Sequence, residues 1–316
     1  MSMLHVGVDL GQGGCRARAR AIDGETSEAT TAGYWSSRLP AVVIADAVHA
    51  AVNGRSADAL RVGVGMTGLN GGKGDAGAVL ARIASLARSV TVVVADDSFT
   101  GYLGALGPVT GAVIAAGTGA VALGVDLPNR VARSDGWGAA LGDRGSGHWI
   151  GLQAIRGALA QWDGGRPGPL LDAVTDRWGD LDGLAARWRA EPPPPDDVAA
   201  IVPAVAEAAR AGDRLALDIW RGAGTALGSS VADVLERLHL AADAVPVAGT
   251  GGVFGQTDLL GEGFRAALTQ RCPAAQIVRA HADPLAGALI LAEAPTMPDA
   301  IETHLSRETN EMSTER

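Results

Sequence analysis

The residues LHVGVDLGQGGCRARARA at positions 4–21 are the most informative guide to the architecture of this chain. An apolar run ends at Asp9, a glycine-rich turn follows, and charged and small residues then alternate from Arg16 to Ala21. Alternation with a period of two is typical of a strand, so the pattern predicts a β-hairpin. The turn lacks the G-x-G-x-x-G spacing and leads into a strand rather than a helix, which argues against a Rossmann dinucleotide site.

A second run of strand, glycine-rich turn and strand extends from Gly111 through Gly117-Thr118-Gly119 to Val125. The repetition has two interpretations, a duplicated lobe or a chance similarity. In either case it predicts another hairpin whose turn exposes backbone N–H groups.

Between these hairpins, strand-like segments at 60–66 and 91–95 alternate with helix-like segments at 41–52 and 75–87. Such alternation predicts a partly parallel sheet with helices on its faces. From Gly147 onward the pattern becomes helical. At 316 residues the chain exceeds a typical domain of about 100–200 residues, so we expect two α/β lobes.

The composition excludes several functional classes. With 47% hydrophobic residues the chain can build cores, yet no run approaches the roughly 20 apolar residues of a membrane span. No charged leader with a cleavage site is visible, so we expect a cytoplasmic protein without membrane contact. The net charge of −9 argues against nucleic-acid binding. Two cysteines, Cys15 and Cys272, exclude a disulfide framework and a four-cysteine metal site within one chain.

Four glycine-rich turns, each after a strand-like run, carry the functional signal. They are Asp9-Leu10-Gly11-Gln12-Gly13-Gly14, Gly117-Thr118-Gly119, Gly136-Trp137-Gly138 and Gly249-Thr250-Gly251-Gly252. Glycine lets backbone N–H groups approach a phosphate closely. One such turn is usually structural, whereas four in order, with carboxylates at strand ends, favour a phosphate-binding enzyme. Lys73 does not form a Walker A motif, because Gly74 stands where that motif needs Ser or Thr.

This ordered set resembles the BadF/BadG/BcrA/BcrD ATPase family, which includes N-acetylglucosamine kinases and belongs to the superfamily of actin, hexokinase and heat-shock-chaperone ATPases. The resemblance runs from Val6 to Ala292. Its most specific part is Gly136-Trp137-Gly138 with Gly142-Asp143-Arg144-Gly145-Ser146, which is similar to the family's Gly-Trp-Gly and Gly-Asp-Glu-Gly-Ser.

The resemblance implies an α/β, two-lobed, actin-like ATPase fold of the ribonuclease H-like type, with a cleft between the lobes. We expect an N-terminal lobe at 1–108 and a C-terminal lobe with a helical insert at 109–283. A terminal helix at 284–295 is expected to return to the first lobe, and a disordered tail is expected at 296–316.

It also implies roles for individual residues. Asp97 is the expected catalytic base, and Asp9 is expected to position Mg²⁺ through water. The residues expected to bind ATP are Gly11, Gly13, Gly14, Cys15, Gly117, Thr118, Gly119, Gly249, Gly251 and Gly252. The residues expected to contact the sugar are Thr67, Gly68, Asp96, Thr118, Gly119, Gly136 and Asp143.

Each carboxylate has a structural alternative. Asp97 stands where a helix N-cap would stand, Asp9 could be an ordinary turn residue, and Asp143 could form an ion pair with Arg144. Two departures from the family pattern also matter. Relatives usually have hydroxyl or basic residues where this chain has Gly13-Gly14-Cys15, and amino-sugar kinases often have asparagine where it has Val121.

The activity implied by the resemblance is ATP-dependent phosphorylation of the 6-hydroxyl of N-acetylglucosamine, with ATP and Mg²⁺ as cofactors. The resemblance is also compatible with a homodimer. The alternatives are a glucosamine kinase, a non-catalytic sugar sensor, and an ATPase that activates a dehydratase through an iron–sulfur cluster shared between two subunits. The last needs two cysteines per chain at the dimer axis.

Overall fold

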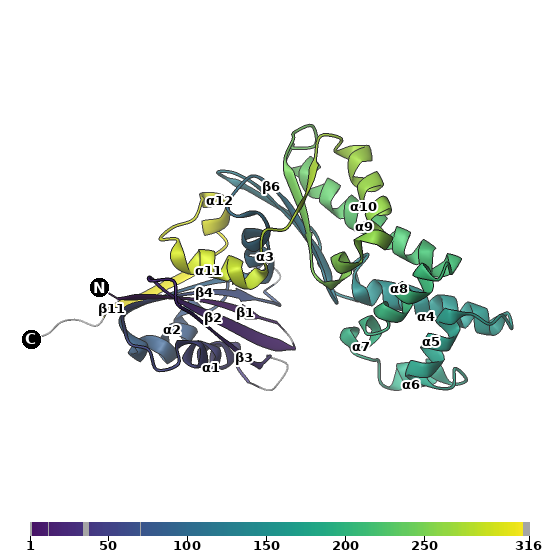
Figure 1. Ribbon diagram of the computed structural model, residues 1–316, viewed down its shortest axis with the longest axis horizontal. Helices are drawn as coiled ribbons and strands as arrows, with labels where there is room; N and C mark the ends of the chain where they lie inside the picture. The colour runs from purple at the N-terminus through teal and green to yellow at the C-terminus, as the bar shows by residue number, and fades with distance from the viewer. Residues whose placement is uncertain (1, 12, 34–37, 70, 312–316) are drawn as a thin grey trace, which may run out of the picture. The chain divides into compact units, whose positions relative to one another are not determined.

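The computed structural model describes residues 2–11, 13–33, 38–69 and 71–311 (Figure 1). The chain divides into two compact units. Unit 1 consists of Met1–Gly111, Val125–Val131 and Arg279–Arg316, and unit 2 consists of Ala112–Gly124 and Ala132–Val278. Each unit contains one sheet with helices packed against it, so the prediction of two α/β lobes is confirmed.

The sheet of unit 1 has the strand order β11-β5-β4-β1-β2-β3. Its strands are β1 (Met3–Leu10), β2 (Gly14–Ala21), β3 (Thr26–Ala32), β4 (Ala57–Met66), β5 (Ala87–Asp96) and β11 (Ser306–Glu311). Strands β1, β4 and β5 are parallel, whereas β2, β3 and β11 run antiparallel to their neighbours. The predicted first hairpin is confirmed, with Leu10 opposite Cys15; Gln12 of its turn lies outside the described residues.

Helices cover both faces of this sheet (Figure 1). One face carries α1 (Pro40–Val52), α2 (Ala76–Ile83) and the short η1 (Ala84–Leu86), and the other carries α3 (Asp97–Leu106) and α11 (Pro284–Glu293). The first face forms an apolar core of valine, leucine and alanine side chains from the strands and from α1 and α2.

Glycines allow α11 to lie directly on the strands and on α3. A Cβ atom at Gly63 of β4 would stand 2.1 Å from the Ala288 carbonyl oxygen, and one at Gly7 of β1 would stand 2.7 Å from the Leu289 nitrogen. A Cβ atom at Gly287 would stand 1.8 Å from the Thr100 carbonyl oxygen of α3. The expected terminal helix therefore packs against the first sheet with almost no space for side chains between the backbones.

The expectation of a disordered tail at 296–316 is wrong for most of that segment. Helix α12 (Asp299–Glu302) is followed by β11, which extends the sheet by pairing with β5, Ser306 opposite Val94 and Glu311 opposite Ser89. Buried Ile301 and Leu305 anchor the segment, and the Ala300 nitrogen donates to the Pro128 carbonyl at 2.7 Å. This bond joins the segment 125–131 to the C-terminal segment of unit 1, whereas we expected residues 109–283 to form one lobe.

The sheet of unit 2 has the strand order β10-β9-β6-β7-β8. Its strands are β6 (Gly111–Ala116), β7 (Ala120–Asp126), β8 (Arg130–Asp135), β9 (Pro246–Thr250) and β10 (Gln276–Arg279). Strands β6 and β7 form the second predicted hairpin, and β9 runs parallel to β6.

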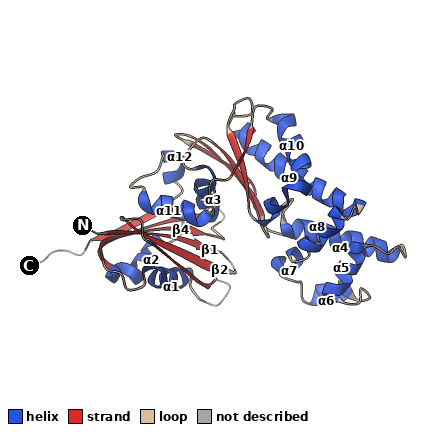
Figure 2. Cartoon of the chain, in the orientation of Figure 1, coloured by secondary structure: helices blue, strands red, loops and turns tan. Residues whose placement is uncertain are grey.

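Outside its sheet, unit 2 is mostly helical (Figure 2). Its helices are α4 (Gly147–Asp163), α5 (Pro169–Trp178), α6 (Leu184–Ala190), α7 (Pro195–Ala199), α8 (Val202–Arg210), α9 (Arg214–Arg237), α10 (Thr257–Arg271) and the short η2 (Gly252–Gln256). Fully buried Trp220 of α9 lies in the shared core with Ile150 of α4. Among the described residues, no helix has both the length and the apolar character needed to cross a membrane.

Candidate active site

In unit 1 the predicted carboxylates gather at the carboxyl ends of three parallel strands. Asp9 near the end of β1 lies opposite Gly65 of β4, and Met66 of β4 lies opposite Asp96 of β5. The Thr67 nitrogen donates to the Leu10 carbonyl at 3.0 Å and holds the following turn against β1. Ligands of open α/β sheets commonly bind outside this edge. The structure therefore brings Asp9, Thr67, Asp96 and Asp97 to one edge.

The helix cap at this edge is Asp96, not Asp97. The Asp96 Oδ1 atom accepts hydrogen bonds from the Ser98 nitrogen at 3.1 Å and the Ser98 hydroxyl at 2.5 Å. Its Oδ2 atom accepts from the Gly71 nitrogen at 3.3 Å. Asp96 thus supplies the cap that α3 needs, and the structural alternative for Asp97 is wrong.

Asp97 is the first residue of α3, and its carboxylate is not the helix cap. Burial, together with the charge of Asp96, raises the pKa of Asp97 to about 6, although a hydrogen bond with the Thr67 side chain opposes the shift. A carboxylate with such a pKa can accept a proton near neutral pH, as a general base must.

Asp9 takes part in an ionic chain along the first hairpin. Its Oδ2 atom lies 2.7 Å from Arg16 Nη2, and Arg16 Nη1 lies 3.4 Å from Oδ2 of Asp283, the N-cap of α11. Within the described ranges no three His, Cys, Asp or Glu side chains converge on a metal position. Mg²⁺ usually arrives with phosphates and water and takes one or two protein carboxylates, so Asp9 at this edge fits such an ion.

Cys15, expected to contact ATP, has its thiol on the opposite sheet face from Asp9. The side chain lies in the core beneath α1, and burial raises the pKa of Cys15 to about 11. Only its main chain remains for a ligand. Gly13 is exposed, and a Cβ atom there would meet no described atom within 4 Å.

In unit 2 two of the glycine-rich turns follow neighbouring parallel strands. The Gly117–Gly119 turn follows β6, and its Gly117 carbonyl accepts from the Gly147 nitrogen at 2.7 Å, which joins it to the start of α4. Gly249 and Thr250 end β9, and the turn continues through Gly251, which has φ 91° and where a Cβ atom would stand 2.4 Å from the Ala116 carbonyl oxygen. Only glycine fits that approach.

The remaining glycine-rich turn of unit 2, Gly136-Trp137-Gly138, is held in place by Asp135, a residue that the sequence analysis did not single out. Its buried carboxylate accepts from the Gly136 nitrogen at 2.9 Å, the Asp143 nitrogen at 2.6 Å and the Arg144 nitrogen at 2.9 Å. Arg144 Nε adds an ion pair at 3.2 Å. The proposed pair between Asp143 and Arg144 is therefore replaced by a pair with Asp135, and Asp143 is not neutralised by its neighbour.

Asp143 faces the second hairpin instead. A Cβ atom at Gly119 would stand 2.7 Å from Asp143 Oδ2, and Oδ1 accepts from the Gly138 nitrogen at 3.3 Å. Burial raises the pKa of Asp143, against hydrogen bonds from the Ala120 and Gly138 backbone that lower it. His148 lies close enough for the charge of Asp143 to oppose the lowering of its pKa by burial.

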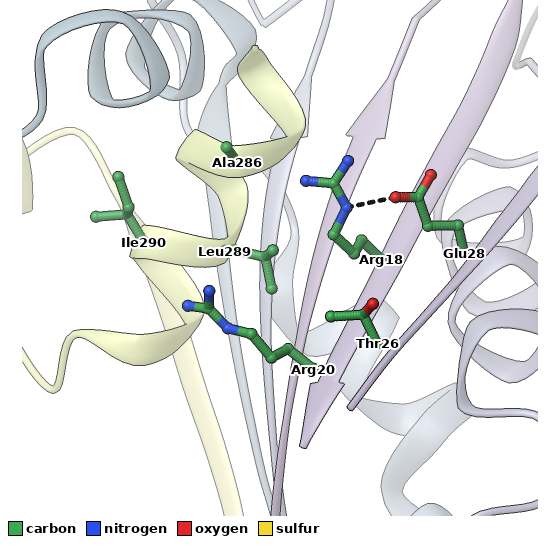
Figure 3. A pocket seen from close by; sticks show the side chains of 7 residues that line it. All are labelled: Arg18, Arg20, Thr26, Glu28, Ala286, Leu289 and Ile290. Carbon is green, nitrogen blue, oxygen red and sulfur yellow. Dashed lines mark hydrogen bonds and ion pairs between the residues drawn. The ribbon is translucent and has the colours of Figure 1, made fainter. Parts of the chain in front are cut away.

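A separate pocket of about 420 Å³ lies on unit 1 beside α11 and is not this site (Figure 3). It is lined by Arg18, Arg20, Thr26, Glu28, Ala286, Leu289 and Ile290. Arg18 Nε lies 2.7 Å from Glu28 Oε1, and Arg20 pairs with Glu293, so both arginines already have acidic partners. None of the residues predicted to bind ATP or sugar lines it.

The sequence profile of the BadF/BadG/BcrA/BcrD ATPase family matches residues 6–292. The chain belongs to this family. The glycine-rich turns and edge carboxylates described above all lie within the matched residues.

Among curated relatives, the N-acetylmuramic acid/N-acetylglucosamine kinase of Clostridium acetobutylicum is 30% identical over 216 residues, which cover 66% of this chain and 70% of that protein. The N-acetyl-D-glucosamine kinase of Dictyostelium discoideum is 29% identical over 218 residues, or 66% of this chain and 67% of that protein. Among solved structures, a candidate N-acetylglucosamine kinase from Chromobacterium violaceum matches with 27% identity and a TM-score of 0.72, covering 92% of this chain and 99% of its own.

A more distant structure supports the fold alone. The ROK family glucokinase of Streptomyces griseus, solved with glucose and AMPPNP, is 19% identical with a TM-score of 0.60, over 92% of this chain and 98% of its own. The expected actin-like ATPase fold is confirmed by these matches.

Proposed function

We propose that the chain is an ATP-dependent kinase that transfers the γ-phosphoryl group of ATP to the 6-hydroxyl of N-acetylglucosamine. The observation that carries the proposal is Asp97. It stands at the carboxyl edge of the sheet, is released from capping by Asp96, and has a pKa of about 6. The names of the relatives, which are kinases of N-acetylated amino sugars, support the choice of acceptor.

In the proposed reaction the 6-hydroxyl oxygen attacks the γ-phosphorus and the bond from that phosphorus to the bridging oxygen of ADP breaks. Asp97 orients the hydroxyl and accepts its proton, while Thr67 orients Asp97 through their side-chain hydrogen bond. Phosphoryl transfer leaves little covalent work to the protein, so positioning and charge stabilisation supply most of the rate. A magnesium ion bound beside Asp9 would offset phosphate charge.

Unit 2 is proposed to bind the rest of both substrates. The Asp143 carboxylate and the Gly136 carbonyl are proposed to accept hydrogen bonds from sugar hydroxyls. The Gly117–Gly119 and Gly249–Gly252 turns are proposed to offer backbone N–H groups to ATP. The exposure of Gly117, Thr118, Gly251 and Gly252 leaves their main chain accessible for this role.

The acceptor preference follows from charge and polarity. Glucosamine carries an ammonium group near neutral pH, and burying it without a carboxylate partner would cost several kcal/mol. Asp96 is a poor partner, because both of its oxygens already accept protein hydrogen bonds. Val121 lies beside Gly136, where a Cβ atom would stand 2.9 Å from the Val121 Cγ2 atom, and presents an apolar contact for an acetyl methyl group.

We therefore expect ADP release from MgATP to require an amino sugar, with kcat/KM at least about tenfold higher for N-acetylglucosamine than for glucosamine. A coupled ADP-release assay over N-acetylglucosamine, glucosamine, N-acetylmuramic acid and glucose measures this. Equal ADP release with and without every sugar would refute the kinase proposal and favour a sugar sensor. A tenfold preference for glucosamine would refute the acceptor alone.

The dehydratase-activator alternative is disfavoured by both thiols. Cys15 and Cys272 are fully buried, Cys15 in the core of unit 1 and Cys272 in that of unit 2. A cluster shared across a dimer axis needs thiolates at the surface, whereas burial raises the pKa of each of these cysteines.

Replacing Asp9 with Asn is expected to raise the Mg²⁺ concentration needed for half-maximal turnover by about tenfold or more, because the amide carries no charge for the ion. The KM for N-acetylglucosamine should change less than threefold. Titrating Mg²⁺ at saturating ATP and sugar measures the first, and sugar titration the second. Loss of sugar affinity with unchanged Mg²⁺ dependence would show that Asp9 has another role.

A further inference from the structure

Asp135 ends β8 in a conformation that most residues avoid. Its φ is 63°, and its side chain is only 2% exposed. A buried carboxylate and a left-handed backbone are both unfavourable, and they persist only where the surroundings hold them in place. Here the surroundings are three peptide N–H groups and one guanidinium, all directed at the two oxygens of this carboxylate. The proposed phosphoryl transfer does not use Asp135, so its conformation needs another explanation.

The bonds of Asp135 lead to Asp143. Oδ1 accepts from the Asp143 nitrogen at 2.6 Å, the shortest of these bonds, and Asp143 itself has φ 55°. Asp143 is thus held at its main chain by Asp135, while its own carboxylate accepts from Gly138 of the same loop. Charge-assisted bonds of this kind are stronger than neutral ones. Asp135 therefore holds the unusual backbone of Asp143, and through it the position from which the Asp143 carboxylate reaches Gly138.

Arg144 completes the arrangement. Its nitrogen and its Nε both donate to Asp135 Oδ2, at 2.9 and 3.2 Å. A glutamate at this position would place a second negative charge beside a buried carboxylate, so Arg144 supplies the counter-charge that the buried Asp135 needs. Because φ is positive at 135, glycine is the residue that could replace Asp135 there without backbone strain.

We propose that Asp135 is a positioning residue that fixes Asp143 for sugar binding, and that Arg144 is the counter-ion that permits its burial. The sugar-binding part of this proposal rests on the proposed function. The effect on Asp143 does not, because it concerns hydrogen bonds within the loop alone.

The test uses Asp135→Gly, Arg144→Glu and the double variant in the full-length protein. Asp135→Gly should raise the KM for N-acetylglucosamine at least about tenfold with the KM for ATP changed less than twofold, since only the sugar-side loop is loosened. Arg144→Glu should raise the sugar KM similarly and lower Tm, because it opposes two like charges. The double variant should recover most of the Tm lost in Arg144→Glu, because the two like charges no longer face each other, while its sugar KM stays raised as in Asp135→Gly.

A conservative variant and a matched control sharpen the result. Asp135→Asn retains an oxygen for the Gly136 and Asp143 nitrogens but cannot accept from Arg144, so its sugar KM should lie between those of the wild type and Asp135→Gly. Asp126→Asn is the matched control. Asp126, the last residue of β7, also pairs with an arginine, Arg130 at the start of β8, and its replacement should leave both KM values unchanged. A purely structural Asp135 would lower Tm in its variants but leave the sugar KM unchanged, and that outcome would overturn the proposal.

Amide hydrogen exchange without substrate provides the second readout. The N–H groups of Asp143 and Arg144 should lose protection at least about tenfold in Asp135→Gly and remain protected in Asp126→Asn. This measurement stays decisive if the protein phosphorylates no sugar, so failure of the proposed function and failure of this inference are distinguishable. Unchanged exchange at both amides would refute the inference whatever the kinetics.

Discussion

Replacing Asp97 with Asn is expected to lower kcat at least about a hundredfold and to raise thermal stability at alkaline pH. The loss of rate follows from removing the proposed proton acceptor, since a positioned general base contributes about a hundredfold to ten-thousandfold. The affinity for ATP should stay within about threefold, because the amide has nearly the same shape. Single-turnover measurements of phosphoryl transfer, together with ATP binding, test this half of the prediction.

The gain in stability follows from the raised pKa of Asp97. Its ordinary value is 3.8 and its value in the folded protein is about 6, so the folded state binds the proton more tightly than the unfolded state does. Stability due to this group is therefore greatest below pH 3.8 and falls as pH rises through about 6. Above that pH the buried, ionised carboxylate destabilises the folded state relative to its protonated form.

An uncharged Asn removes this pH-dependent cost. The Tm of the Asp97→Asn variant should exceed that of the wild type at pH 8, and the difference should shrink at pH 5. In the wild type, kcat/KM should fall as pH decreases below about 6, because the base must be deprotonated. Asp75→Asn, at the cap of α2, serves as the control and should leave kcat unchanged. Near-normal turnover, or a lower Tm at pH 8, would assign Asp97 a structural role.

Local sequence patterns predicted most of the fold, because strands and tight turns are specified by residues close together in the sequence. The alternation in Arg16–Ala21 predicted a strand with one buried and one exposed face, and the glycines of the two predicted hairpins indicated tight turns. The terminal strand β11 escaped because its polar sequence carries no such signal. It is held by main-chain bonds to β5 and by buried Leu305, and a partner strand distant in sequence cannot be inferred from composition.

The sequence names candidate site residues where a motif contains them, but the contacts of each residue are visible only in the structure. Asp96 and Asp97 are adjacent and chemically identical, and only the bonds to Ser98 show which one caps α3. Cys15 follows the first glycine-rich turn in sequence, yet the strand periodicity turns its thiol into the core. Asp135 is an ordinary residue at a strand end until the fold brings the Asp143 and Arg144 nitrogens to its oxygens.

Two alanine substitutions in the Gly117–Gly119 turn are expected to separate sugar binding from ATP binding. A Cβ atom at Gly119 would stand 2.7 Å from Asp143 Oδ2, too close for contact, so Gly119→Ala must displace that carboxylate. Asp143 is short, and its other oxygen is bonded to the Gly138 nitrogen, so it cannot move aside without losing that bond. We expect the KM for N-acetylglucosamine to rise at least about tenfold, with little change in the KM for ATP.

Gly117→Ala provides the comparison in the same turn. A Cβ atom at Gly117 meets no described atom within 4 Å, so the methyl group should fold without strain and project from an exposed turn. If ATP phosphates approach this backbone, the methyl group obstructs them, and the KM for ATP should rise at least about fivefold while the sugar KM stays within twofold. Both variants should retain a Tm within a few degrees of the wild type, which excludes unfolding as the cause. Equal shifts in both KM values, or the reverse pattern, would show that the turn does not divide the two substrates between Gly117 and Gly119.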